Sequence, residues 1–268
     1  MSAPNATLSR LKAIPFFDCL SNTQLEMLAR ASWERSYGKG MLVFLKGDQP
    51  TGLFAVISGT LKMACQSPRG GEKVIDLPAS GRVFGEAALL LGSPYPYYVA
   101  ALSPARLLHI DGRVLYELIG ASPTFAQRMM MHIAQGISVV LGDLEDYCMR
   151  DSHQRVARYL LDRATAGDGA LIRFPALHHV VASRLGMTPE SLSRAMHELE
   201  EAGMIEICKR ATRVIDRKKL AVLVDPHSGW PMYGKFSDCR PASADIYREG
   251  SETKPMRTSP ALAASAIT

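Results

Sequence analysis

The sequence predicts an α+β protein with an N-terminal jelly-roll β-barrel, one long helix and a C-terminal winged helix-turn-helix. Three patterns support this fold class. Glycine-separated short apolar runs come first, an apolar repeat with 3- and 4-residue steps follows, and a turn with an amphipathic helix comes last. The expected boundaries are 1–121 for the barrel, 122–149 for the long helix, 150–224 for the winged helix-turn-helix domain and 225–268 for a tail.

The composition is that of a soluble globular protein that carries a basic region. Apolar residues make up 47% of the 268 residues, and the formal net charge is +5. Thirteen Lys and Arg face nine Asp and Glu between residues 150 and 219, which suits contacts with phosphates. No apolar run approaches the ~20 residues of a membrane span, and the N-terminus lacks the layout of a signal peptide. We therefore expect a cytoplasmic protein.

The cysteines are scattered and form no CxxC pair. This spacing favours reduced thiols in a cytosolic protein. It also argues against an iron–sulfur cluster, because such a cluster needs about four clustered thiolates. The five cysteines are Cys19, Cys65, Cys148, Cys208 and Cys239.

The barrel is predicted from the spacing of short apolar runs. Residues 8–30 are expected to be helical, with a break at Pro15 and a second helix that Ser21 caps. From Trp33 to Asp111 the apolar runs are short and glycines separate them, which is typical of an antiparallel barrel or sandwich of jelly-roll type. The expected strands lie within 41–45, 53–57, 61–65, 73–77, 99–102 and 106–110.

A long helix is predicted next. Ser122 is a suitable N-cap and Pro123 a suitable first residue. Apolar residues then alternate at 4- and 3-residue steps over about 40 Å of helix, which is the pattern of a coiled-coil seam. The seam either pairs with a second copy or packs on the chain's own barrel. Its members are Phe125, Met129, Ile133, Ile137, Val140, Leu144 and Tyr147.

The segment after the long helix has the pattern of a winged helix-turn-helix. Gly186 can supply the sharp turn between its two central helices. After about Val224 the periodicity is lost, and the tail is expected to be mostly disordered. The expected elements are helices at 152–166 and 176–185, a strand at 171–174, and a hairpin formed by 204–208 and 213–216.

The second helix of this motif is the most informative part of the chain. Thr188 is a natural N-cap, and Pro189 suits the first helical position. The spacing buries one face and leaves a polar face that can reach base edges in a major groove. An ordinary surface helix with an i,i+4 pair between Glu190 and Arg194 is the alternative. The buried face holds Leu192, Ala195, Met196 and Leu199, and the polar face holds Glu190, Ser193, Arg194 and His197.

From about Leu8 to Val224, this order of elements resembles the CRP/FNR family of bacterial transcription regulators. Gly81-Arg-Val-Phe-Gly-Glu86-Ala-Ala-Leu is similar to the family's cyclic-nucleotide cassette, and Glu190-x-x-Ser193-Arg194 is similar to the recognition helix of the FNR branch. The resemblance implies a homodimer that binds double-stranded DNA at sites like TTGAT…ATCAA and acts, if an activator, on RNA polymerase. It implies base contacts from Glu190, Ser193 and Arg194, and weaker contacts to the DNA backbone from Arg184, Thr188 and Lys209.

The cassette departs from the family pattern. Cyclic-nucleotide-binding members carry an Arg-Ser or Arg-Thr pair that holds the phosphate, whereas this chain has no Arg or Lys between Arg82 and Arg106. A buried phosphate without a cation is costly to desolvate. We therefore expect no cyclic AMP signalling. The expected effector pocket contains Phe84, Gly85, Glu86, Tyr97 and Tyr98.

Other features bear on the sensor. The N-terminal cysteine cluster of the oxygen-sensing members is absent, and the Pro-Tyr-Pro-Tyr97 segment is similar to the nitric-oxide-responsive branch that controls denitrification. That resemblance implies haem, which needs an axial His, Cys or Met. None of the candidates falls in a specific motif, so the effector is unknown. They are His109, His132, Cys65 and the run Met129 to Met131.

Three alternatives stay open at this stage. A regulator of the same fold could use another effector or none. A sensor module that binds protein through its winged helix would need no DNA contact, but the Glu190–Arg194 spacing and the basic C-terminal region disfavour it. A metal-dependent barrel enzyme needs two or three His ligands, and the barrel segment offers only His109. We therefore expect no enzymatic activity.

Overall fold

The computed structural model describes residues 4–68, 70–164, 169–174, 176–209 and 211–224. No helix within these ranges is long and apolar enough to cross a membrane. The expected tail at 225–268 lies outside the described residues.

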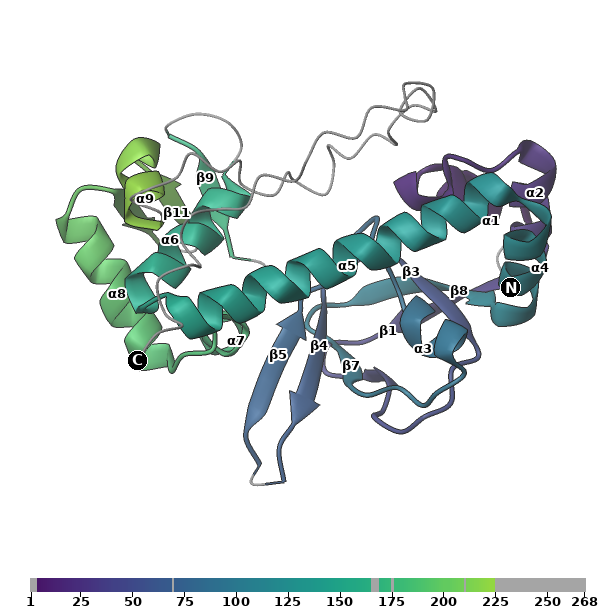
Figure 1. Ribbon diagram of the computed structural model, residues 1–268, viewed down its shortest axis with the longest axis horizontal. Coiled ribbons are helices and arrows are strands. Elements are labelled where there is room, and N and C mark those ends of the chain that lie inside the picture. The colour runs from purple at the N-terminus through teal and green to yellow at the C-terminus, as the bar shows by residue number, and fades with distance from the viewer. Residues whose placement is uncertain (1–3, 69, 165–168, 175, 210, 225–268) are drawn as a thin grey trace, which may run out of the picture. The chain divides into compact units, whose positions relative to one another are not determined.

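The N-terminal half contains two four-stranded antiparallel sheets (Figure 1). One sheet has the order β1-β8-β3-β6 and the other the order β2-β7-β4-β5. This is the predicted jelly-roll sandwich. The strand bounds are β1 Ser32–Tyr37, β2 Leu42–Phe44, β3 Gly52–Ser58, β4 Leu61–Gln66, β5 Glu72–Asp76, β6 Val83–Phe84, β7 Tyr98–Ala101 and β8 Ala105–Asp111.

The first sheet separates two apolar cores because side chains alternate along its strands. Leu53 and Ala55 of β3 face a core shared with the N-terminal helices, whereas Phe54 and Val56 face the interior between the sheets. Ser21 begins α2 with the predicted cap, a full capping box with Gln24. The helical elements of this half are α1 Pro4–Lys12, the 3-10 turn η1 Pro15–Phe17, α2 Asn22–Arg30, α3 Glu86–Leu91 and α4 Gly112–Ala121.

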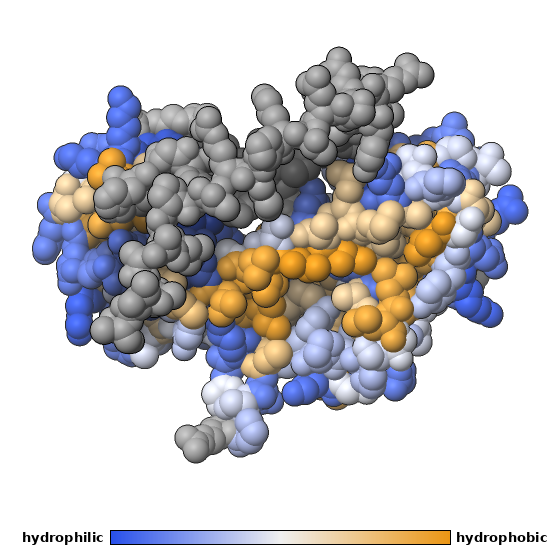
Figure 2. Space-filling view, in the orientation of Figure 1, coloured by the Kyte–Doolittle hydropathy of each residue, from blue (hydrophilic) through white to orange (hydrophobic). Residues whose placement is uncertain are grey.

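The long helix is α5, Pro123–Met149, and it is continuous (Figure 1). Its N-cap is Ser122, whose hydroxyl accepts a hydrogen bond from the backbone N–H of Phe125 at 3.3 Å. The predicted seam divides into two parts. Phe125 and Met129 pack into the chain's own core, and Figure 2 shows an apolar band along the rest of the helix. The exposed seam residues are Ile137, Val140, Leu144 and Tyr147.

The C-terminal domain is a helical bundle with a three-stranded sheet in the order β10-β11-β9. Its core is continuous from α6 to α9 and includes Leu160, Leu192, Met196 and Val214. The arrangement is the predicted winged helix-turn-helix. The bounds are α6 Ser152–Arg163, β9 Leu171–Arg173, α7 His178–Leu185, α8 Pro189–Glu201, β10 Ile205–Cys208, β11 Ala211–Val214 and α9 Arg217–Val224.

Candidate nucleic-acid interface and sensor site

The turn before α8 has the geometry that the sequence predicts. Gly186 has φ +66°, a left-handed conformation that glycine adopts without strain, and it ends α7. The Thr188 hydroxyl accepts a hydrogen bond from the backbone N–H of Ser191 at 3.2 Å, and Pro189 is the first helical residue. The start of α8 is therefore held by local interactions.

The two faces of α8 differ in exposure. Leu192, Ala195, Met196 and Leu199 are buried in the domain core. Glu190, Ser193, Arg194 and His197 are exposed. Among the ion pairs of the described residues, none joins Glu190 to Arg194, so the two side chains are not held together as a surface pair.

The exposed face of α8 carries one negative and one positive side chain, Glu190 and Arg194. The backbone N–H of Glu190, in the first turn of α8, and the Thr188 hydroxyl hold the pKa of the Glu190 carboxyl below its usual range. Glu190 is therefore an ionised hydrogen-bond acceptor at neutral pH. Arg194, one turn further on, is a permanent cation with a planar set of donors. The face thus carries one acceptor and one forked donor, which together can distinguish base edges.

The three residues expected to touch the DNA backbone have different environments. The Arg184 guanidinium is bound by the Asp143 carboxylate of α5, at 2.9 and 2.8 Å to its two oxygens. Thr188 caps α8. Lys209 is exposed in the turn between β10 and β11. Thr188 and Lys209 are both exposed to solvent, whereas Arg184 is engaged within the chain.

The structure adds a contact that the sequence did not predict, between α7 and the edge strand β5. The Ser183 hydroxyl donates to the carbonyl of Glu72 at 2.9 Å and accepts from the backbone N–H of Val74 at 3.0 Å. The Lys73 ammonium donates to the carbonyls of Ser183 and Arg184, both at 3.1 Å. The first helix of the helix-turn-helix is therefore hydrogen-bonded to the sandwich edge.

The cassette segment forms the junction between β6 and α3. Gly85 has φ +96°, which favours glycine at this position. The Phe84 ring stacks on Phe54 with centroids 5.3 Å apart. Glu86 begins α3, and its Oε1 lies 3.5 Å from Nε2 of His132 on α5.

Burial dominates the electrostatics of the Glu86–His132 contact. Burial raises the pKa of the Glu86 carboxyl and lowers the pKa of His132 to about 4. The second carboxylate oxygen of Glu86 is buried and has no hydrogen-bond partner among the described residues. An anionic ligand bound beside this carboxyl would find no cation in the segment around it, because residues 83–105 contain no Lys or Arg.

The tyrosines of the expected pocket point to different sides of their sheet. Tyr97 packs against the interior core with Phe44, at a centroid distance of 5.9 Å, and burial raises its pKa. Tyr98 packs on the outer face with Ala64, and its hydroxyl donates to the Glu72 carboxylate. The structure therefore groups Phe84, Gly85, Glu86 and Tyr97 but places Tyr98 outside the group.

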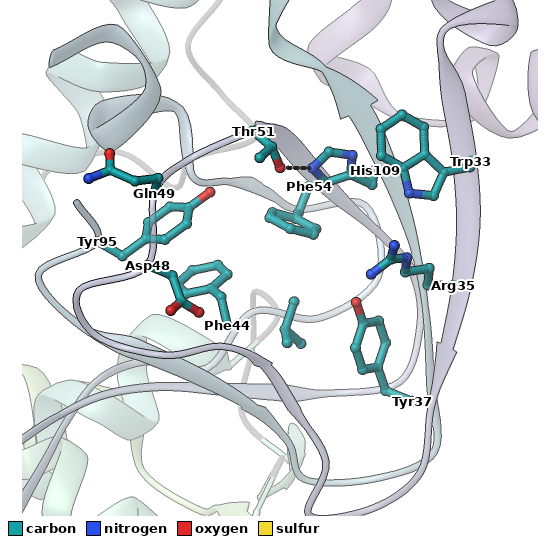
Figure 3. A pocket seen from close by; sticks show the side chains of 11 residues that line it. Trp33, Arg35, Tyr37, Phe44, Asp48, Gln49, Thr51, Phe54, Tyr95 and His109 are labelled. Atoms are coloured by element: carbon teal, nitrogen blue, oxygen red, sulfur yellow. Dashed lines mark hydrogen bonds between the residues drawn. The ribbon is translucent and has the colours of Figure 1, made fainter. Parts of the chain in front are cut away.

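The histidine and cysteine candidates for a haem ligand lie on three different elements. His109 of β8 has Nε2 3.0 Å from the Thr51 hydroxyl. His132 lies beside Glu86, and the Cys65 thiol of β4 is 3.6 Å from the carbonyl of Pro96. Of these three, only His109 lines a cavity of about 360 Å³ at one end of the sandwich (Figure 3).

Both halves of the chain match known protein families. Residues 34–122 match the cyclic nucleotide-binding domain family, and residues 154–223 match the Crp-like helix-turn-helix domain family. Together these segments cover more than half of the sequence. A nucleotide-binding-type sandwich joined by a long helix to such a DNA-binding domain defines a class of DNA-binding transcription regulators.

Whole-length relatives identify the family. The cyclic AMP receptor protein of Thermus thermophilus is 26% identical over 197 residues, which is 74% of this chain and 90% of that protein. The fumarate and nitrate reduction regulatory protein of Salmonella typhimurium is 25% identical over 193 residues, 69% of this chain and 76% of that protein. The chain belongs to the CRP/FNR family.

Solved structures agree with this fold. FixK2 from Bradyrhizobium japonicum superposes with a TM-score of 0.65 at 20% identity, covering 72% of this chain and 96% of that one. A CooA mutant from Carboxydothermus hydrogenoformans superposes with a TM-score of 0.64 at 17% identity, covering 76% and 90%. At these identities the likeness concerns the fold alone.

Proposed function

We propose that this regulator is a homodimer that reads a TTGAT-N4-ATCAA-like palindrome through Glu190, Ser193 and Arg194. The observation that carries the proposal is the exposed face of α8, where these three side chains stand together on a helix whose opposite face is buried. Each protomer would place one α8 in a major groove and read one half-site.

The chemistry of these side chains suits the bases of that half-site. The Arg194 fork matches the two acceptors, O6 and N7, that guanine presents in the major groove. The Glu190 carboxylate accepts from the exposed amino group of cytosine or adenine. The Ser193 hydroxyl lies one position before Arg194 and can donate or accept. Lys209 would add a phosphate contact, since it is exposed in the wing turn.

Dimerisation would use the exposed part of the α5 seam. Ile137, Val140, Leu144 and Tyr147 are each more than half exposed and recur at coiled-coil steps. An apolar stripe of this kind on a soluble helix indicates an interaction surface. A two-fold pairing there would set the two α8 helices one DNA turn apart, about 34 Å.

The proposed regulator works without cyclic AMP. In the cassette, a cyclic phosphate would lie near the buried Glu86 carboxyl without the loop cation that such a site needs. The aromatic rings of Tyr95 and Phe44 stack at 3.7 Å inside the same sandwich. Isothermal titration calorimetry should detect no cyclic AMP binding in the micromolar range. Micromolar binding would overturn this part of the proposal.

The regulated genes are proposed from similarity. The recognition triplet resembles that of the FNR branch, and one relative is named for fumarate and nitrate reduction. We infer control, through RNA polymerase, of genes for anaerobic or nitrogen-oxide respiration, with activation as the expected direction. Loss of nitrite-induced transcription in a deletion strain, restored by the intact gene, would support this role. Unchanged transcription would contradict it.

Fluorescence anisotropy with a labelled duplex tests the DNA proposal directly. The intact protein should bind TTGAT-N4-ATCAA at least tenfold more tightly than a scrambled duplex at fixed salt. Arg194→Ala should remove most of this preference, since a lost bidentate contact costs about 1–3 kcal/mol. Arg113→Ala is the matched control, because Arg113 is a highly exposed arginine of the sensor half. Equal binding of both duplexes by the intact protein would refute the proposal.

A further inference from the structure

The cavity at one end of the sandwich has the composition of a small-molecule site. Its volume is about 360 Å³, within the range of ligand pockets. Its walls are largely aromatic, and Figure 3 shows the side chains turned around a common hollow. The aromatic residues in its lining include Trp33 and Tyr37 of β1, Phe44 of β2 and Phe54 of β3.

Two buried polar atoms of this cavity have no hydrogen-bond partner among the described residues. They are Nδ1 of His109 and the hydroxyl oxygen of Tyr95. His109 is only 4% exposed, and its other nitrogen already meets the Thr51 hydroxyl at 3.0 Å. Buried polar groups are normally paired, and a ligand that hydrogen-bonds these atoms would satisfy them.

The cavity also contains a cation. Arg35 of β1 lines it, and Figure 3 shows the guanidinium directed into the hollow beside the Tyr37 hydroxyl. Among the described residues, no carboxylate lies within ion-pair distance of Arg35. Asp48 lies across the hollow, where its carboxylate accepts from the backbone N–H of Leu45 at 2.8 Å. The cavity is thus cationic on one side and hydrogen-bond accepting on the other.

We propose that this cavity binds a small aromatic carboxylate that carries a hydroxyl group opposite its acid group. The carboxylate would pair with Arg35, whose planar fork suits a carboxylate. The ring would stack among Phe44, Phe54 and Trp33. The hydroxyl would donate to the Asp48 carboxylate, which lies across the hollow from Arg35. Glu86 does not line this cavity, although Phe54 and Tyr95, which do, adjoin the cassette at Phe84 and Gly85.

Trp33 provides a direct readout. It stands at the cavity with its ring 4.3 Å from that of His109, and it is 41% exposed. The sequence contains two tryptophans, so the full-length Trp230→Phe variant reports on Trp33 alone. Titration of this protein with 4-hydroxybenzoate should give a saturable fluorescence change, and calorimetry on the wild type should give the same dissociation constant.

Matched variants and a matched ligand test the polarity of the site. Arg35→Gln should weaken 4-hydroxybenzoate binding at least tenfold, while Arg113→Gln should leave it unchanged. The neutral analogue 4-hydroxybenzyl alcohol should bind the unaltered site at least tenfold more weakly than the acid. Thermal unfolding of each variant checks that the fold is retained; Arg35 is exposed, so its replacement should be tolerated.

Three results would overturn the proposal. They are absence of saturable binding at millimolar 4-hydroxybenzoate, equal binding by the wild type and Arg35→Gln, and equal binding of the acid and the alcohol. The titrations contain no DNA. Their failure would therefore leave the proposed DNA-reading function untouched, and failure of that function would not affect them.

Discussion

Truncation of Leu144 tests the proposed dimer. Leu144 lies on the α5 seam and is 56% exposed in the single chain. Complete burial of a leucine side chain contributes about 1.5–3 kcal/mol, so covering the exposed half contributes about 1–1.5 kcal/mol. A two-fold dimer contains the residue twice, which makes the loss for Leu144→Ala about 2–3 kcal/mol. The dimer should therefore dissociate about 30- to 150-fold more readily.

Sedimentation equilibrium over a range of protein concentrations measures this change. The control is Val139→Ala, because Val139 is 44% exposed on the same helix but stands off the seam. It should leave the dissociation constant within about threefold of wild type. Both residues are partly exposed, so neither truncation should unfold the chain. An unchanged constant for Leu144→Ala, or equal weakening by Val139→Ala, would refute the seam as the dimer contact.

Two further predictions concern stability. Burial holds the pKa of His109 at about 4, so the folded state stays unprotonated where the unfolded state takes up a proton. The free energy of unfolding should therefore decrease by up to about 3 kcal/mol as pH drops from about 6.5 to about 4. Urea unfolding should show a smaller decrease for His109→Gln. Equal decreases for the two proteins would contradict this assignment. Thr188→Ala removes the cap of α8 and should cost about 1 kcal/mol in urea unfolding, whereas Thr188→Ser should restore most of it. Equal stability of all three proteins would show that the cap contributes nothing.

The long periodic elements could be predicted from the sequence because their signals are local. α5 and α8 each combine a capping residue, a proline at the first position and an apolar repeat over several turns. β1 was not predicted as a separate strand, since its Ser-Trp-Glu-Arg-Ser-Tyr37 sequence is mostly polar and largely exposed. β6 has only two residues, too few for any periodic signal.

The arrangement of side chains on a single helix could be predicted from the sequence, but contacts between residues distant in the sequence could not. The exposed and buried faces of α8 follow from helical spacing, and the structure confirms them. The pairing of Arg184 with Asp143, and of His109 with Thr51, joins residues 41 and 58 positions apart. Tyr97 lies in the bend before β7 and packs on the interior core, whereas Tyr98 is the first residue of the strand and packs on the outer face. No local pattern contains this information.

A double-mutant cycle between Arg194 and the guanine of the half-site tests the central claim most directly. Anisotropy titrations would compare the wild type and Arg194→Ala on the TTGAT-N4-ATCAA duplex and on a duplex with that G·C pair replaced by A·T in both half-sites. If Arg194 reads the guanine, each single change weakens binding about 10- to 100-fold, and the second change adds little to the first. Fully additive losses would contradict the account, because they would mean that Arg194 and the guanine act independently.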